Sequence, residues 1–364
     1  MWAFKPEFSF SRFATQMMIL ISIILPVMLA ARTADIMRGV FFCFAFGSIL
    51  NALLILGGYS TESLADTVKI GYPGYFVYKG ILGEFAAFAF LLSLYEIFHP
   101  GWRRALGLII IAISIYLVLV SESKGSLGCA ILAAILATLV LFVRRKMRVS
   151  PAIVLLSLPI CYAVLSRIFG DLVNRLSWYV YGNYTLSGRV FIWDFVNSEI
   201  AKRPLLGWGY RSFWLVGPDS PSLTDAGGWG WVRHMPSAHN GYLETMLDTG
   251  YVGLVLFLVF LFATFHAIGR VADRDPARAW LLLSIALFTA LVNFLEAGWL
   301  RGQDGLSLIF VFVVAEAGRN WQPLHRRLGA AGTIAQRPAI LRRPPVLVRA
   351  DGTGRLPRRR DIFT

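Results

Sequence analysis

Long apolar runs dominate this sequence and limit the folds that it can adopt. Several of them approach or exceed the roughly 18–20 residues that an α-helix needs to cross a bilayer. The chain of 364 residues is 57% hydrophobic and 15% charged, with a mean hydropathy of +0.62, whereas soluble domains are about 45–50% apolar and about 25% charged. The sequence therefore predicts an all-α, polytopic bundle of transmembrane helices, and no cleavable signal peptide is expected at its start.

We expect about nine or ten spans, of which nine can be placed. Short loops rich in Lys and Arg alternate with less basic ones, as cytoplasmic and outer loops do. A basic tail puts the C-terminus in the cytoplasm, so an odd number of nine spans places the N-terminus outside. The positive charges of Lys5 and Arg12 favour the cytoplasmic side instead. A further span near the start is therefore kept as an alternative. The nine predicted spans are 14–31, 38–57, 77–98, 105–120, 126–143, 151–169, 242–268, 279–299 and 305–317.

The spans divide the chain into four parts. Residues 1–169 hold six spans, residues 170–241 form one large outer loop with short helices, and residues 242–318 hold three more spans. From Arg319 onward the tail carries 11 arginines and two aspartates, so residues 319–364 are expected to be disordered. The net charge of +14 is concentrated there, where it suits the cytoplasmic side and anionic lipid headgroups rather than nucleic acid.

The large loop is rich in aromatic residues. Aromatic faces beside polar groups suit sugar rings, although an aromatic belt at the membrane interface would give a similar composition. A belt explains the residues near 178 well and the mid-loop residues less well, so Trp193 and Trp208 are candidate sugar-binding residues. The loop holds six of the eleven tryptophans of the chain: Trp178, Trp193, Trp208, Trp214, Trp229 and Trp231.

A short helix is predicted within the loop, from the segment "SGRVFIWDFVNSEIAK". Ser187 is its expected N-cap, and Pro204 follows its end. Arg189 stands at the start, where the positive end of the helix dipole disfavours a cation. This placement suggests an anionic partner, and a solvated arginine is the alternative. The following turn, "PLLGWGY", contains two glycines that allow close approach of the backbone.

Polar residues close the loop directly before the span 242–268. A histidine can act as a general base near neutral pH, so His239 is a candidate base, with a merely interfacial role as the alternative. Asn240 beside it can donate hydrogen bonds, and His234 is a second histidine nearby. Lys124 lies on the same outer side, in the short turn "SESKGS", although a lone interfacial lysine is usually a membrane anchor.

The sequence carries no metal or cofactor signature. The loop contains no Asp-x-Asp pair, no H-E-x-x-H, no G-x-S-x-G and no P-loop, so no cofactor is expected and positive charge would come from side chains. Glu84 and Glu296 are the deepest carboxylates in the predicted spans. Such residues are functional hypotheses by default, and the alternative is a structural role with a neighbouring asparagine or lysine.

In their order along the chain, these motifs resemble the O-antigen ligase and polymerase superfamily. Over residues 187–259 the chain has G-R-x-x-x-W, a Pro-x-x-Gly-x-Gly turn, H-N-x-Tyr-Leu and a later Gly-x-x-Gly. The turn "SESKGS" resembles the Ser-Arg-Gly turn of that family, with lysine in place of arginine. This variant is more similar to exopolysaccharide polymerases of the succinoglycan type.

The resemblance implies a glycosyltransferase in the bacterial inner membrane with its active site on the periplasmic face. It would transfer a glycan from undecaprenyl pyrophosphate to an acceptor hydroxyl, without a metal and with inversion at the anomeric carbon. His239 would be the base, Arg189 and Lys124 would stabilise the pyrophosphate, and Arg211 and Arg233 are second phosphate contacts. The implied partners are an undecaprenyl-pyrophosphate-linked oligosaccharide, an acceptor glycan or glycolipid, membrane lipids and other polysaccharide assembly proteins, with no nucleic acid.

Two activities within this family stay open. The Ser-Lys turn and the modest length favour polymerisation of exopolysaccharide repeat units, and the alternative is ligation of O-antigen to lipid A-core. A polysaccharide transporter or flippase is the alternative from another class. It would predict paired charges deep in several spans or inverted repeats, and the sequence shows few of the former and none of the latter. A non-catalytic scaffold would leave His239 and Arg189 unexplained.

Overall fold

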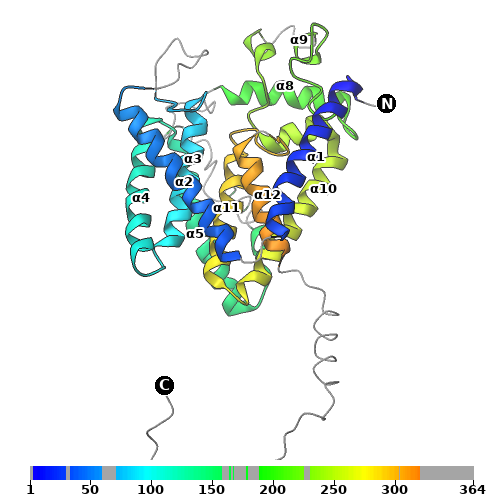
Figure 1. Cartoon of the computed structure of the whole chain (residues 1–364). Helices are drawn as coiled ribbons and strands as arrows, with labels where there is room; N and C mark the ends of the chain where they lie inside the picture. The colour runs from blue at the N-terminus through cyan, green and yellow to red at the C-terminus, as the bar shows by residue number, and fades with distance from the viewer. Residues whose placement is uncertain are drawn as a thin grey trace, which may run out of the picture. The chain divides into compact units, whose positions relative to one another are not determined.

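The computed structural model of the chain is helical (Figure 1). It describes residues 3–29, 33–59, 71–157, 164, 167, 178, 188–224, 230–302 and 304–319, without the side chain of Lys124. These residues belong to one compact unit, Met1–Trp321. They contain no strand, which confirms the predicted all-α class. The predicted disordered tail lies outside the described residues from position 320 onward.

Eight of the nine predicted spans correspond to helices. Five of them, α1, α2, α4, α5 and α10, are long and apolar enough to cross a membrane, and α11 and α12 are shorter apolar helices. The predicted span 151–169 is described as a helix only over 151–157, apart from single residues beyond it. The eight helices are α1 (Pro6–Leu29), α2 (Thr33–Leu56), α3 (Lys79–Glu96), α4 (Trp102–Val120), α5 (Lys124–Met147), α10 (Gly241–Ala272), α11 (Pro276–Val292) and α12 (Gly305–Gly318).

Helix α1 begins eight residues before the predicted start of the first span. Pro6 occupies its first turn, where a fixed φ and a missing N–H are tolerated, and Glu7 complements the positive end of the helix dipole. These residues are polar or helix-breaking by composition, so hydropathy alone places the boundary too late. The extra turns carry Ser9 and Arg12 into the helix.

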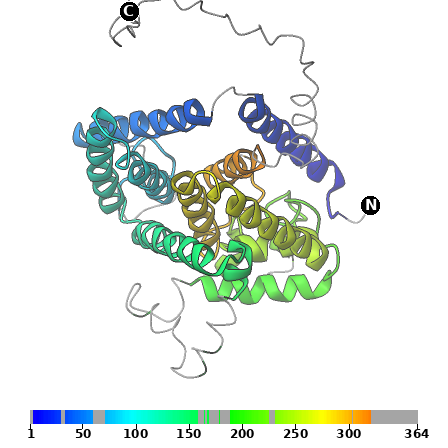
Figure 2. The same ribbon diagram turned by 90° about the horizontal axis from the view of Figure 1, so that it is seen from below.

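Helix α11 forms the centre of the bundle. It packs against α3, α5, α10 and α12, while α2, α3 and α4 pack together and α1 packs on α12 (Figures 1 and 2). Every residue of α11 from Leu281 to Thr289 is buried. A helix that is apolar on all sides is typical of such a core position.

Helix α10 is broken at Gly250, and the turn after α8 supplies hydrogen-bond partners for the backbone groups at the break. Gly250 has φ 67° and ψ −170°, which is not helical. The N–H groups of Trp208 and Gly209 donate to the carbonyl groups of residues 247 and 248, both at 2.9 Å, and the N–H of Tyr251 donates to the carbonyl of Pro204 at 2.8 Å. A Cβ on Gly250 would lie 2.2 Å from the backbone of residue 205. The predicted close approach at "PLLGWGY" is confirmed, whereas the single span 242–268 is in fact two helical segments.

The large loop has a hydrophobic core of its own. Its helices are α8 (Arg189–Lys202), α9 (Pro221–Thr224) and the 3-10 helix η1 (Gly230–His234), and they lie at one end of the bundle (Figure 1). Helix α8 ends at residue 202, before Pro204 as predicted. Its N-cap is Gly188 rather than Ser187, which lies outside the described residues. The buried core residues are Ile192, Phe195, Val196, Ile200, Trp208, Phe213, Trp214, Val232, Ala238 and Leu247.

Candidate active site

Three side chains from distant parts of the chain meet beside the start of α10. The Nη2 of Arg189 lies 2.9 Å from Oε1 of Glu296, and Nδ1 of His239 lies 3.2 Å from Oε2 of the same carboxylate. Arg189 also donates from Nε to the carbonyl of Leu295 at 2.9 Å. The carboxylate of Glu296 therefore bridges the arginine and the histidine, two of the predicted catalytic residues.

The ring of His239 keeps one nitrogen available. Because a carboxylate only accepts hydrogen bonds, Nδ1–H donates to Glu296, and Nε2 is then the unprotonated, basic nitrogen of the neutral ring. Nε2 has no hydrogen-bond partner among the described residues. The side chain is 30% exposed. A histidine oriented by a carboxylate at one nitrogen, with the other open, has the arrangement of a general base.

The backbone at His239 is strained and firmly anchored. His239 has φ 47°, a left-handed conformation that is uncommon outside glycine. The preceding residue, Ala238, accepts a hydrogen bond from Trp193 Nε1 at 3.1 Å and donates one to Glu244 Oε2 at 2.8 Å. Glu244 also accepts from Trp214 Nε1 at 3.1 Å. These contacts fix the segment on which the histidine is held.

Asn240 caps α10 and ties it to the segment that carries the carboxylate. Its Oδ1 accepts from the N–H groups of Tyr242 and Leu243 at 3.0 and 3.1 Å, the usual action of an N-cap asparagine. Its Nδ2 donates to the carbonyl of Phe294 at 3.4 Å. Both polar ends of this predicted substrate-binding side chain are thus engaged within the protein.

Glu296 lies after α11 and not inside a span as the predicted boundary 279–299 implied. Helix α11 ends at Val292, where Asn293 turns the chain by accepting from the N–H groups of Gly298 and Trp299, both at 2.9 Å. Partial burial alone would raise the pKa of Glu296, whose side chain is 40% exposed. The hydrogen bond and charge of His239, together with Arg189, outweigh burial and lower the pKa below its ordinary value.

The structure does not bring the other predicted arginines to this cluster. Arg211 lies beside Arg12 of α1. Arg233 donates from Nε to Nε2 of His234 at 3.1 Å, within an exposed part of η1. Arg233 and His234 therefore remain predicted substrate contacts, and the structure does not place them beside Glu296.

Trp193 and Trp208 differ in their surroundings. Trp193 is partly buried and supports the backbone beside His239. Trp208 is only 6% exposed, donates from Nε1 to the carbonyl of Glu199 at 3.1 Å and has the guanidinium of Arg203 over its ring at 4.2 Å. Its ring faces are covered, so the structure places it in the loop core. Of the other loop tryptophans, Trp214 is buried, Trp178 and Trp231 are exposed, and Trp229 lies outside the described residues.

Lys124 begins α5, and its side chain is outside the described part of the structure. The preceding residue, Ser123, packs closely against Gly83 of α3. The neighbouring Glu84 lies within electrostatic range of Asp304 and Glu296. The turn that carries Lys124 is therefore connected to the region of the candidate site through α3.

The role of Glu296 could not be predicted from the motifs. It is 57 residues from His239 and 107 residues from Arg189, and no local spacing connects them. The available signal was a carboxylate within an apolar run, which identifies a candidate but not its partners. The packing of α8, α10 and the turn after α11 supplies those partners.

The fold and this cluster define a multi-pass membrane protein with a histidine–carboxylate pair beside its large loop. Residues 109–258 match the family model described as O-antigen ligase. This match, which covers the middle part of the chain, confirms the resemblance found in the sequence. All three residues of "AHN", 238–240, lie in the matched range, whereas Glu296 lies beyond it.

Similar proteins include polysaccharide ligases and an exopolysaccharide protein. The chain is 26% identical over 239 residues to a putative polysaccharide ligase of Rickettsia felis, which covers 63% of this chain and 56% of that protein. It is 24% identical over 236 residues to the putative polysaccharide ligase RC0486 of Rickettsia conorii, a match that covers 63% of this chain and 55% of that protein. It is 26% identical over 321 residues to the exopolysaccharide production protein ExoQ of Rhizobium meliloti, a match that covers 82% of this chain and 70% of that protein. The chain spans just over half the length of the two Rickettsia relatives.

Proposed function

We propose that the chain is an integral inner-membrane glycosyltransferase with its active site on the periplasmic face. It transfers an undecaprenyl-pyrophosphate-linked glycan to the hydroxyl of an acceptor sugar by metal-independent, inverting displacement. The observation that carries the proposal is the bridging carboxylate of Glu296, which holds His239 by Nδ1 at 3.2 Å and leaves Nε2 without a hydrogen-bond partner among the residues that the structure describes.

In the proposed reaction, Nε2 of His239 takes the proton of the acceptor hydroxyl as its oxygen bonds to the anomeric carbon. The bond from that carbon to the pyrophosphate oxygen breaks, and the electron pair leaves with the pyrophosphate. Glu296 stabilises the imidazolium that forms, as a carboxylate does in a catalytic triad. Arg189, at the positive N-terminus of α8, and Lys124 stabilise the charge on the leaving group.

Polymerisation of exopolysaccharide repeat units is the activity that we favour. The match to ExoQ extends over 82% of this chain, against 63% for the two Rickettsia ligases, and the Ser-Lys turn points the same way. The alternative is O-antigen ligation to lipid A-core, which the names of the Rickettsia relatives support. The two activities share the donor and the base and differ in the acceptor.

A deletion strain complemented with variants tests this proposal. Loss of high-mass exopolysaccharide would indicate a polymerase, and accumulation of unlinked O-antigen would indicate a ligase. We expect His239→Ala to fail to restore the polymer although the protein accumulates in the membrane. The matched control is His266→Ala, since His266 lies near the far end of α10 and bonds Ser150. Unchanged glycans in the deletion strain would refute both activities.

A further inference from the structure

Trp231 differs from the other tryptophans that the structure describes. It is 49% exposed, and it makes no hydrogen bond and no ring contact among the described residues. The indole N–H groups of Trp193, Trp208 and Trp214 each donate to an oxygen of the protein. An exposed indole without a partner keeps its N–H donor and part of its ring available for an outside molecule.

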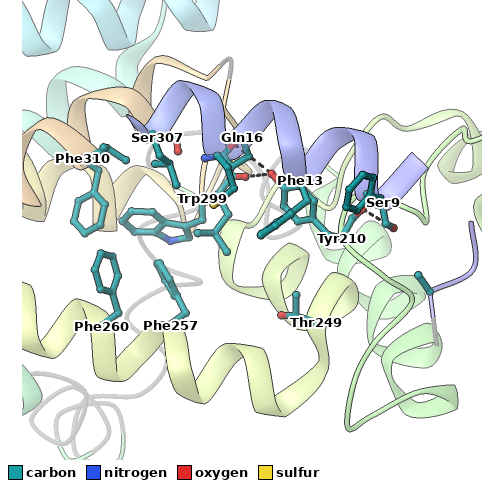
Figure 3. A pocket seen from close by; sticks show the side chains of 16 residues that line it. Ser9, Phe13, Gln16, Tyr210, Thr249, Phe257, Phe260, Trp299, Ser307 and Phe310 are labelled. Atoms are coloured by element: carbon teal, nitrogen blue, oxygen red, sulfur yellow. Dashed lines mark hydrogen bonds between the residues drawn. The ribbon is translucent and has the colours of Figure 1, made fainter. Parts of the chain in front are cut away.

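Trp299 shows the opposite situation. It is 3% exposed, and the centroid of its ring lies 4.9 Å from the ring centroids of both Phe257 and Phe310. Figure 3 shows these three side chains together in the lining of an apolar cavity between α1, α10 and α12. Aromatic neighbours occupy the ring of Trp299, so its role is in packing.

The ring of Trp231 lies against the start of α8. Its Cζ2 and Cη2 atoms are 3.6 Å from the position that a Cβ would take on Gly188. Gly188 is the N-cap of α8, with φ 85°, and Arg189 is the first residue of the helix. Val232, the residue after Trp231, is buried in the core of the large loop and anchors η1 there. The indole is therefore held beside the residue that precedes the arginine of the candidate site.

The order of these groups indicates which sugar the indole would meet. Arg189 binds Oε1 of Glu296, and His239 binds Oε2. In the proposed reaction the pyrophosphate lies at Arg189 and the acceptor hydroxyl lies at His239. Because Trp231 contacts the neighbour of Arg189, the sugar attached directly to the pyrophosphate is the one placed nearest to it.

We propose that Trp231 binds the first sugar of the donor, the one linked to pyrophosphate, by stacking on the C–H face of its ring. The faces of an indole carry partial negative charge, and the C–H groups of a sugar ring carry partial positive charge, so the two attract each other. The available Nε1–H can also donate to a sugar hydroxyl. This inference rests on the proposed function, because it uses the position of the pyrophosphate at Arg189.

Transfer kinetics of the purified full-length protein test the contact. The substrate is the lipid-linked oligosaccharide extracted from the deletion strain. Trp231→Ala should raise KM for it by about tenfold and change kcat by less than about twofold, since uniform binding energy affects KM alone. Trp231→Phe keeps an aromatic face and should restore most of the affinity. Trp231→Leu keeps only apolar surface and should not.

Tryptophan fluorescence measures the contact without turnover. The lipid-linked oligosaccharide should change the emission of His239→Ala, and adding Trp231→Phe to that variant should remove most of the change. Undecaprenyl pyrophosphate without a sugar is the matched ligand and should give a several-fold smaller change. An equal response to both ligands would overturn the sugar contact.

The outcomes separate this inference from the proposed function. Wild-type protein that transfers no glycan refutes the proposed function, and the fluorescence measurement then decides the sugar contact by itself. Active wild type with an unchanged KM in Trp231→Ala overturns the inference alone. An unchanged KM with less protein in the membrane would make Trp231 an interfacial anchor instead. Trp102→Ala is the matched control, because Trp102 is an exposed tryptophan at the start of α4, and it should leave KM unchanged.

Discussion

Two Arg–Glu pairs lie near the start of α10, and their surroundings differ. Arg189 and Glu296 are 2.9 Å apart, and Arg301 and Glu244 are 2.8 Å apart. The side chain of Glu296 is 40% exposed, whereas that of Glu244 is 6% exposed. The same pair of residue types is therefore placed once at an accessible surface and once in the interior.

The second oxygen of each carboxylate explains the difference in role. Oε2 of Glu296 meets the ring of His239, a titratable side chain. Oε2 of Glu244 meets the backbone N–H of Ala238 and the indole N–H of Trp214, which are fixed donors. Glu244 thus holds the segment that carries the histidine, and Glu296 orients its ring. The comparison separates a structural carboxylate from a positioning carboxylate within one site.

Of the substitutions that distinguish the two Arg–Glu pairs, Glu296→Gln is expected to have the largest effect, and that effect is on kcat. The amide keeps the shape but cannot stabilise an imidazolium, so kcat should fall on the order of 10²–10⁴-fold, as it does on neutralising a triad carboxylate. Protein yield should stay near that of the wild type, because Glu296 is partly exposed. Transfer assays on purified protein check this. A variant with full kcat would remove Glu296 from the mechanism.

Glu244→Gln should act on folding instead. Removing one partner of a buried ion pair typically costs about 3–5 kcal/mol, and here it leaves Arg301 without its carboxylate. We expect a lower melting temperature and less protein in the membrane, measured by fluorescence-detected size exclusion. Glu7→Gln, at an exposed position of α1, is the control. Normal stability combined with lost activity would reverse the roles assigned to the two carboxylates.

Much of the fold and part of the candidate site could be predicted from the sequence, but the contact between Glu296 and His239 could not. The apolar runs predicted eight of the helices, and the motifs around residues 188–193 and 239–240 identified Arg189 and His239. The kink at Gly250 was not predicted because hydropathy carries no information on backbone conformation. The break depends on backbone hydrogen bonds between α10 and residues 204–209. Glu296 was missed as a partner because tertiary packing alone brings it to the histidine.

The pH dependence of stability sharpens the comparison further. The lowered pKa of Glu296 means that its charged form stabilises the fold, an effect fully present above the ordinary value of 4.5 and lost as the pH falls through the lower folded value. The stability difference between wild type and Glu296→Gln should therefore shrink as the pH falls below about 4.5. Thermal unfolding in detergent from about pH 5 to about pH 3 measures it. A difference that grows over this acidic range would contradict the assigned direction.

Trp193→Phe should have the smallest effect. It removes one hydrogen bond to Ala238, worth about 0.5–1.5 kcal/mol, while the ring still packs. If Trp193 positions His239, kcat should fall by about fivefold with KM unchanged. A raised KM with unchanged kcat would instead assign the indole to sugar binding, since uniform binding energy affects KM alone.

Rescue of His239→Ala by imidazole tests the central claim most directly. The assay measures glycan transfer by purified protein with and without added imidazole. We predict that His239→Ala loses at least about 10²-fold in rate and regains part of it with imidazole, rising with pH as the neutral base accumulates, while Glu296→Gln gains nothing. Wild-type transfer by His239→Ala without imidazole would contradict the account.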